Sequence, residues 1–145
     1  MNKKFKLEKV LELREKALER EKIKLADLQQ KEKEAREEIN TVIEDIKSKN
    51  DEMEQDKAKG LFDFIEMYNK YIAVRQNDLA ACEAKLQAAV QEVNKQKEVL
   101  KKSLNDLKVM EKLKAKHLLD YAEYVKKQEN MQIDEINISR GHSAE

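Results

Sequence analysis

Apolar residues recur at every seventh position over a long central stretch of the chain. The first set is entirely aliphatic: Ile65, Ile72, Leu79, Leu86, Val93, Leu100 and Leu107. A second set, three residues further on, is apolar at four of its seven positions: Tyr68, Arg75, Cys82, Ala89, Gln96, Ser103 and Met110. A strict seven-residue repeat keeps a narrow apolar stripe facing a partner helix. This stripe is too narrow for a globular core and predicts a two-helix interface.

The N-terminal part of the chain carries a similar but weaker repeat. Its first set is apolar except at Glu32: Leu11, Leu18, Leu25, Glu32, Ile39, Ile46 and Met53. Its companion set is apolar at only three positions: Arg14, Glu21, Leu28, Ala35, Val42 and Lys49. The pattern predicts a helix over residues 3–58, with a weaker interface near Glu21 and Glu32.

A single reversal between the two repeats predicts the fold class. Gly60 is the only glycine before Gly141, and the chain contains no proline. Glycine suits the left-handed position that ends a helix, so the turn is placed at residues 57–62. A second helix then follows over residues 62–138, and residues 139–145 form a frayed tail. The prediction is an all-α protein, one long antiparallel two-helix coiled-coil hairpin over residues 1–145.

The register of this hairpin can be written as simple arithmetic. With the turn at Gly60, the numbers of facing residues add up to about 120, and the second helix extends about 20 residues past the start of the first. The repeat is expected to slip near Lys114, after which Leu118, Tyr121 and Val125 carry the apolar stripe. Tyr68 and Tyr121 are expected in the interface, whereas Tyr71 and Tyr124 are expected on the surface.

Composition and charge narrow the function classes. Charged residues make up 41% and aromatic residues 5% of the chain, and this balance is typical of long helices. No apolar run is long enough to span a membrane. The formal net charge is zero, so general nucleic-acid affinity is not favoured. The single cysteine, Cys82, cannot form a disulfide within the chain and fits a reducing cytoplasm.

Charge is nevertheless unevenly distributed. Residues 1–16 hold six basic and three acidic side chains, and residues 101–127 hold eight basic and four acidic. Residues 44–66 hold eight acidic and four basic side chains. One interpretation is a solvated surface with local ion pairs. The other is a basic open end and an acidic turn end that bind two different partners.

The sequence offers no recognisable active site. His117 and His142 have no second ligand at metal-binding spacing, and Cys82 is expected to act as a small buried hydrophobe. No phosphate-binding loop is present, and a two-helix protein offers no cleft for a substrate. We therefore expect no enzyme activity, no cofactor, no metal, no small-molecule substrate and no nucleic-acid partner.

Four segments follow one another along the chain: residues 5–15 (FKLEKVLELRE), 68–71 (YNKY), 105–113 (NDLKVMEKL) and 134–136 (DEI). In this order and spacing they resemble the FliJ family of the bacterial flagellar type III export apparatus. The resemblance covers residues 5 to about 138. It implies a monomeric, cytoplasmic hairpin that associates peripherally with the inner-membrane export apparatus and so serves flagellum biogenesis, motility and chemotaxis.

The resemblance also implies partners. Family members insert the end that bears both termini into a hexameric export ATPase, contact the export-gate membrane protein FlhA, and in some cases escort export chaperones. The ATPase-contact candidates are Phe5, Leu7, Val10, Leu11, Arg14, Lys112, Lys116, Leu118, Tyr121 and Val125. The gate-contact candidates are Tyr68, Tyr71 and Arg75. Three alternatives remain at this stage: a structural coiled-coil oligomer, the equivalent stalk of a virulence secretion system, and a membrane or nucleic-acid binder that uses the basic end.

Overall fold

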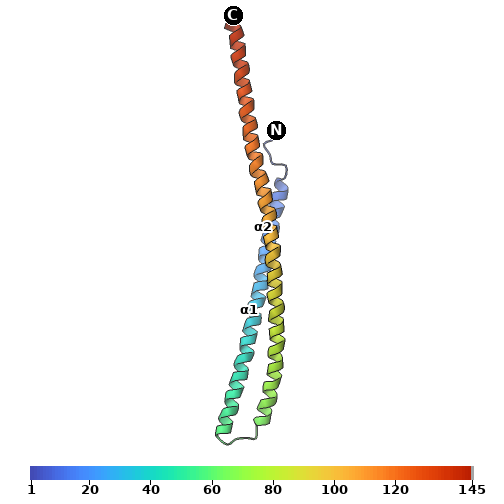
Figure 1. Cartoon of the computed structure of the whole chain (residues 1–145), viewed down its shortest axis with the longest axis vertical. Coiled ribbons are helices and arrows are strands. Elements are labelled where there is room, and N and C mark those ends of the chain that lie inside the picture. Colours follow the sequence, from blue (N-terminus) through green and yellow to red (C-terminus); the bar gives the residue numbers. More distant parts are fainter. Residues whose placement is uncertain (145) are drawn as a thin grey trace. The chain divides into compact units, whose positions relative to one another are not determined.

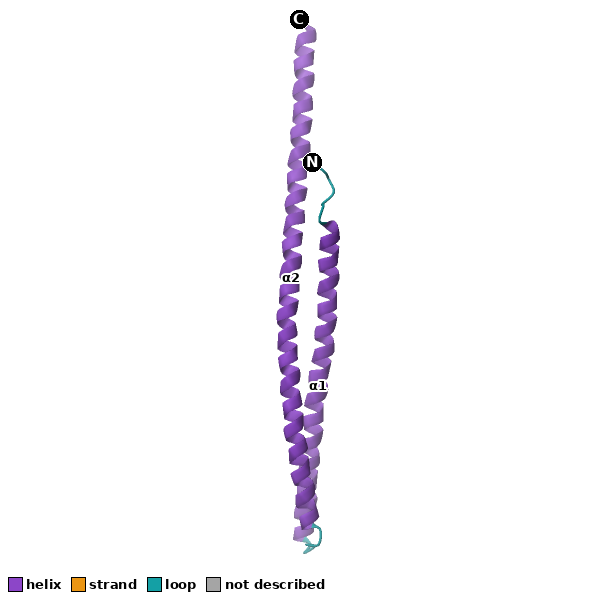
Figure 2. Ribbon diagram, turned by 90° about the vertical axis from the view of Figure 1, so that its right-hand side faces the viewer, coloured by secondary structure: helices purple, strands orange, loops and turns teal. Residues whose placement is uncertain are grey.

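The computed structural model describes residues 1–144 and consists of two helices. Helix α1 spans Glu8–Ala58 and helix α2 spans Ile65–Ala144, and no strand occurs among the described residues (Figure 1). Non-helical segments precede α1 and connect the helices across residues 59–64 (Figure 2). The predicted fold class, an all-α antiparallel two-helix hairpin, is confirmed. Neither helix, over its described residues, contains a segment that could cross a membrane.

The helix ends differ from those predicted. Helix α1 begins at Glu8 rather than at residue 3, because the preceding segment packs against α2, where the Lys3 carbonyl lies 3.2 Å from His117 Nε2. Helix α2 begins at Ile65 rather than at residue 62. It continues to Ala144, so residues 139–144 are helical rather than frayed, since Gly141 weakens a helix without terminating it. Residue 145 of the predicted tail lies outside the described residues.

The chain forms two compact units. One unit contains residues 1–20 and 101–144, and the other contains residues 21–100. The organisation of residues 1–145 as one domain stays a prediction.

In the unit of residues 21–100, both helices bury the side chains that the repeats predict. The most buried are Ala35, Val42, Met53, Ile72, Cys82 and Val93. Lys85 Nζ lies 3.1 Å from Glu38 Oε2, and Arg75 Nε lies 2.8 Å from Asp45 Oδ2. As the residue number rises along α1 it falls along α2, so the helices are antiparallel and facing numbers add up to about 120, as predicted.

In the unit of residues 1–20 and 101–144, the buried residues are Leu11, Leu18 and Leu107. Arg14 lies 3.6 Å from Asp106, and Lys114 Nζ lies 3.0 Å from Glu8. The slip predicted at Lys114 is wrong at Leu118, which is 50% exposed, because the repeat positions continue through Lys114 and His117. Tyr121 and Val125 are half-buried, as predicted. Two contacts explain this register: Glu8 pairs with Lys114, and the Phe5 ring packs 5.7 Å from that of His117.

The connection between the helices begins with a Schellman motif. Gly60 has a φ of 76°, in the left-handed region. Its N–H donates to the Lys57 carbonyl (3.1 Å), and the Leu61 N–H donates to the Asp56 carbonyl (2.8 Å). This pair of bonds satisfies carbonyl groups that the end of α1 would otherwise leave unpaired. The structure thus places the end of α1 where the glycine suggested.

Candidate protein-contact surfaces

The three gate-contact candidates form polar bonds within residues 21–100. The Tyr68 hydroxyl donates to Asp56 Oδ2 (3.1 Å), and the Tyr71 hydroxyl donates to Asp45 Oδ2. Arg75 donates to the same Asp45 oxygen and, over 3.1 Å, to Asp78. The polar groups of these three residues therefore bond to other residues of the hairpin. Tyr71 is 40% exposed, and its ring is the part that faces solvent.

Electrostatic coupling within this cluster follows the same bonds. The hydrogen bond from Tyr71 holds the pKa of Asp45 below its ordinary value, and Arg75 lowers it further. The reciprocal hydrogen bond to Asp45 raises the pKa of Tyr71. Burial is the main cause that raises the pKa of Tyr68, and the hydrogen bond to Asp56 raises it further. Lys49 Nζ lies 5.6 Å from the centroid of the Tyr71 ring. The cluster therefore stabilises charged Asp45 and neutral tyrosines.

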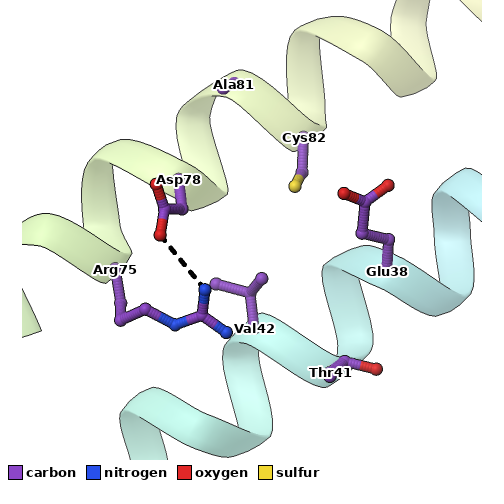
Figure 3. A pocket seen from close by; sticks show the side chains of 7 residues that line it. All are labelled: Glu38, Thr41, Val42, Arg75, Asp78, Ala81 and Cys82. Atoms are coloured by element: carbon purple, nitrogen blue, oxygen red, sulfur yellow. Dashed lines mark hydrogen bonds and ion pairs between the residues drawn. The ribbon is translucent and has the colours of Figure 1, made fainter.

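A pocket beside this cluster is lined by Glu38, Thr41, Val42, Arg75, Asp78, Ala81 and Cys82 (Figure 3). In Figure 3 the Cys82 sulfur and the Glu38 carboxylate face each other across the two helices. Burial raises the pKa of the Cys82 thiol, and the negative charge of Glu38 raises it further. Lys85 lowers the pKa of Glu38. A thiol with a raised pKa is mostly protonated at neutral pH and is therefore a poor nucleophile.

The ATPase-contact candidates all lie in the unit of residues 1–20 and 101–144. They divide by exposure. Leu11 is 4% exposed and lies in the helix interface, while Phe5, Val10, Tyr121 and Val125 are half-buried. The exposed candidates are Leu7, Arg14, Lys112, Lys116 and Leu118.

Exposed apolar side chains accompany these candidates in the same unit. Leu13 and Leu119 are 64% and 67% exposed, and Leu119 was not selected from the sequence. Tyr121 and Tyr124 lie with their ring centroids 6.5 Å apart. Tyr121 is half-buried and Tyr124 is exposed, which confirms the predicted placement of this pair. The unit therefore combines exposed apolar side chains with exposed lysines contributed by both helices.

Sequence reasoning missed an exposed apolar group around the turn. Leu61, Phe62, Phe64 and Met67 are each more than half exposed. The available signal was four large apolar residues within seven positions, none of which belongs to either repeat set. Among residues 1–144, no cluster of His, Cys, Asp and Glu side chains is arranged to hold a metal ion.

Two long antiparallel helices that bury a narrow apolar stripe between them define the class of coiled-coil helical hairpins. The family model described as "Flagellar FliJ protein" matches residues 3–145. The chain therefore belongs to the FliJ family, whose members are components of the flagellar export apparatus. The chain shows no significant similarity to any curated protein or to any solved structure.

Proposed function

We propose that this protein is a non-enzymatic stalk that inserts into the hexameric flagellar export ATPase and couples it to the export gate. The observation that carries the proposal is the family match over residues 3–145. The proposal assigns the ATPase contact to residues 1–20 and 101–144, and the contact with FlhA to residues 21–100. It also includes an escort role towards export chaperones, and a cytoplasmic location beside the inner-membrane apparatus.

The surface of residues 1–20 and 101–144 supports the ATPase contact. Leu7, Leu118 and Leu119 are between 40% and 67% exposed, and large exposed apolar side chains commonly mark protein contacts. Lys112 and Lys116 are exposed on the same helix and supply positive charge. Charges at the rim of an interface mainly accelerate association, whereas the apolar side chains supply most of the affinity.

The polar cluster of residues 21–100 supports a stalk role. Asp45 accepts hydrogen bonds from Tyr71 and Arg75 on the opposite helix, so the two helices are fixed in register at this level. A stalk that transmits a contact from one partner to another has to resist sliding of its helices. Polar groups inside a coiled coil are a known means of specifying register.

The proposal is tested by an ATPase assay with the purified export ATPase. Lys112→Glu/Lys116→Glu is expected to slow docking and to reduce stimulation of ATP hydrolysis, most strongly at low salt. Leu118→Ser/Leu119→Ser is expected to reduce stimulation at all salt concentrations, because it removes apolar contact area.

Matched controls lie in residues 21–100. Lys95→Glu/Lys97→Glu changes the net charge equally on the same helix and is expected to leave stimulation unchanged. Circular dichroism verifies that all variants stay helical. Stimulation that is lost in the Lys95/Lys97 variant and kept in both other variants contradicts the assignment. Sedimentation of the wild-type chain alone is expected to give the mass of a monomer. The mass of a dimer would instead support the alternative of a structural coiled-coil oligomer.

A further inference from the structure

The turn presents an apolar surface that the hairpin does not use. Leu61, Phe62, Phe64 and Met67 are 53%, 64%, 56% and 60% exposed. We call these four side chains the turn patch. All four belong to the unit of residues 21–100, and Leu61 to Phe64 lie in the connection between the helices. Two phenylalanines held in water at a turn are an unfavourable arrangement unless something covers them.

Local structure does not account for the turn patch. In a Schellman motif the residue after the glycine, here Leu61, commonly packs against an apolar side chain in the last turn of the helix. The facing positions here are Asp56 and Gln55, and Leu61 stays exposed. The interface between the helices does not need the patch either, because Met53 and Ile72 fill it at this level. Motif and interface would form equally well with polar residues at Leu61, Phe62 and Phe64.

Charge around the turn patch identifies the kind of partner. Residues 44–66 hold eight acidic and four basic side chains. Asp63, Glu66 and Glu54 are exposed near the patch. Glu54 pairs with Lys57 and Glu66 with Lys70, each at 3.3 Å, and acidic side chains still outnumber basic ones at this end. An apolar centre with a negatively charged surround complements an apolar pocket bordered by lysine or arginine. The same negative charge repels an anionic lipid surface.

We propose that the turn patch docks into an apolar pocket with a basic rim on the export-gate protein. This inference rests on the proposed function and names the anchor of its gate contact. Phe62 and Phe64 supply the affinity, because buried aromatic side chains dominate binding energy at protein interfaces. Asp63 and Glu66 steer the encounter. Tyr68 and Arg75 position the turn through their bonds to α1 instead of touching the partner.

The experiment measures the affinity of the full chain for detergent-solubilised FlhA. Phe62→Ser/Phe64→Ser is expected to weaken binding at least about tenfold. The matched control is Ile23→Ala/Val99→Ala, which removes two exposed apolar side chains from the same unit and is expected to bind like the wild type. Asp63→Lys/Glu66→Lys is expected to slow association, with an effect that shrinks as salt rises. Unchanged helicity and thermal unfolding verify the fold of each variant.

The outcomes separate this inference from the function on which it rests. If the wild type does not bind FlhA, the proposed gate contact fails and the inference fails with it. If the wild type binds and Phe62→Ser/Phe64→Ser binds equally well, the gate contact stands and the inference is overturned. Two further results also overturn it: self-association of the wild type that the variant loses, and cosedimentation with phosphatidylcholine–phosphatidylglycerol vesicles that the variant loses.

Discussion

Arg75 on α2 reaches across the helix pair to Asp45 on α1, with its Nε 2.8 Å from the carboxylate oxygen. Arg75 occupies a position of the repeat that an apolar residue would normally fill, and its side chain is 26% exposed. The same carboxylate oxygen accepts a hydrogen bond from Tyr71. Asp45 therefore binds side chains from two successive turns of α2 at one position on α1.

Removing that shared acceptor tests the cluster. Asp45→Ala is expected to lower the melting temperature, because Arg75 and Tyr71 both lose their cross-helix partner in a partly buried site. The control is Asp51→Ala, an exposed acidic residue on the same helix, which is expected to change the melting temperature little. Circular dichroism at 222 nm follows the unfolding, and equal melting temperatures for the two variants would contradict the shared-acceptor arrangement.

The helix interface is tested by two valines on one helix. Val93 is 3% exposed and Val99 is 43% exposed. Val93→Asp is expected to destabilise the hairpin by roughly 3 kcal/mol or more, because it buries an unpaired charge. Val99→Asp is expected to cost less than about 1 kcal/mol, chiefly through helix propensity. Urea unfolding measures both, and similar costs would show that the assigned interface is incorrect.

The two glycines are expected to respond differently to replacement by alanine. Gly60→Ala is expected to cost about 1 kcal/mol, because its φ of 76° is strained for any residue with a Cβ atom. Gly141 lies within α2 and an added Cβ meets nothing within 4 Å. Gly141→Ala is therefore expected to increase helicity or leave it unchanged. Thermal unfolding and the helical signal of the two variants provide the comparison, and a neutral Gly60→Ala would argue against the left-handed turn.

At low pH the protein is expected to lose the folding stability contributed by the two carboxyl groups whose pKa values are lowered. The pKa of Asp45 is lowered from 3.8 by Tyr71 and Arg75, and the pKa of Glu38 is lowered from 4.5 by Lys85. A carboxyl group whose pKa is lower in the folded chain than in the unfolded chain stabilises the fold at pH values above its ordinary pKa. This stabilisation is lost as the pH falls through the pKa of the folded state. The melting temperature of the double variant Glu38→Gln/Asp45→Asn should thus lie below that of the wild type at pH 7 and match it at about pH 2. A gap that persists unchanged in acid would contradict the assignment.

Cys82 provides a single reporter, because the chain contains one cysteine. Its thiol is buried and its pKa is raised by burial and by Glu38, so it is expected to react slowly with a disulfide reagent at neutral pH. Full unfolding in denaturant is expected to accelerate the reaction. Glu38→Gln is expected to accelerate the thiol reaction moderately in the folded chain, because the negative charge that raises the pKa of Cys82 is removed. Equal rates for folded and unfolded chains would place the thiol on the surface.

Most of the fold follows from the spacing of apolar residues. All seven companion positions from Tyr68 to Met110 are buried or half-buried, including the polar Arg75, Gln96 and Ser103. Tyr71 and Tyr124 lie on the surface, as their positions beside the repeat predicted. A strict repeat fixes the buried face of a helix whatever the identity of a single residue, so isolated polar substitutions do not obscure it.

What the sequence does not determine is how polar residues inside the interface are satisfied. The Gln96 amide donates to the backbone carbonyl and the side chain of Glu21, and Lys114 pairs with Glu8. These partners come from the other helix, more than 70 positions away, so no local pattern reveals them. The prediction that Leu118 joins the interface after Lys114 failed for this reason. The exposure of Phe62 and Phe64 depends on where α2 begins, and the sequence placed that start three residues too early.

The thinness of the helix interface affects how this protein responds to temperature. Among the described residues no large side chain is completely buried. The heat-capacity change of unfolding scales with the apolar surface that becomes hydrated, so it is small per residue here. A small heat-capacity change flattens the curve of unfolding free energy against temperature. Cooling below room temperature therefore weakens this hairpin less than it weakens a compact domain of equal length.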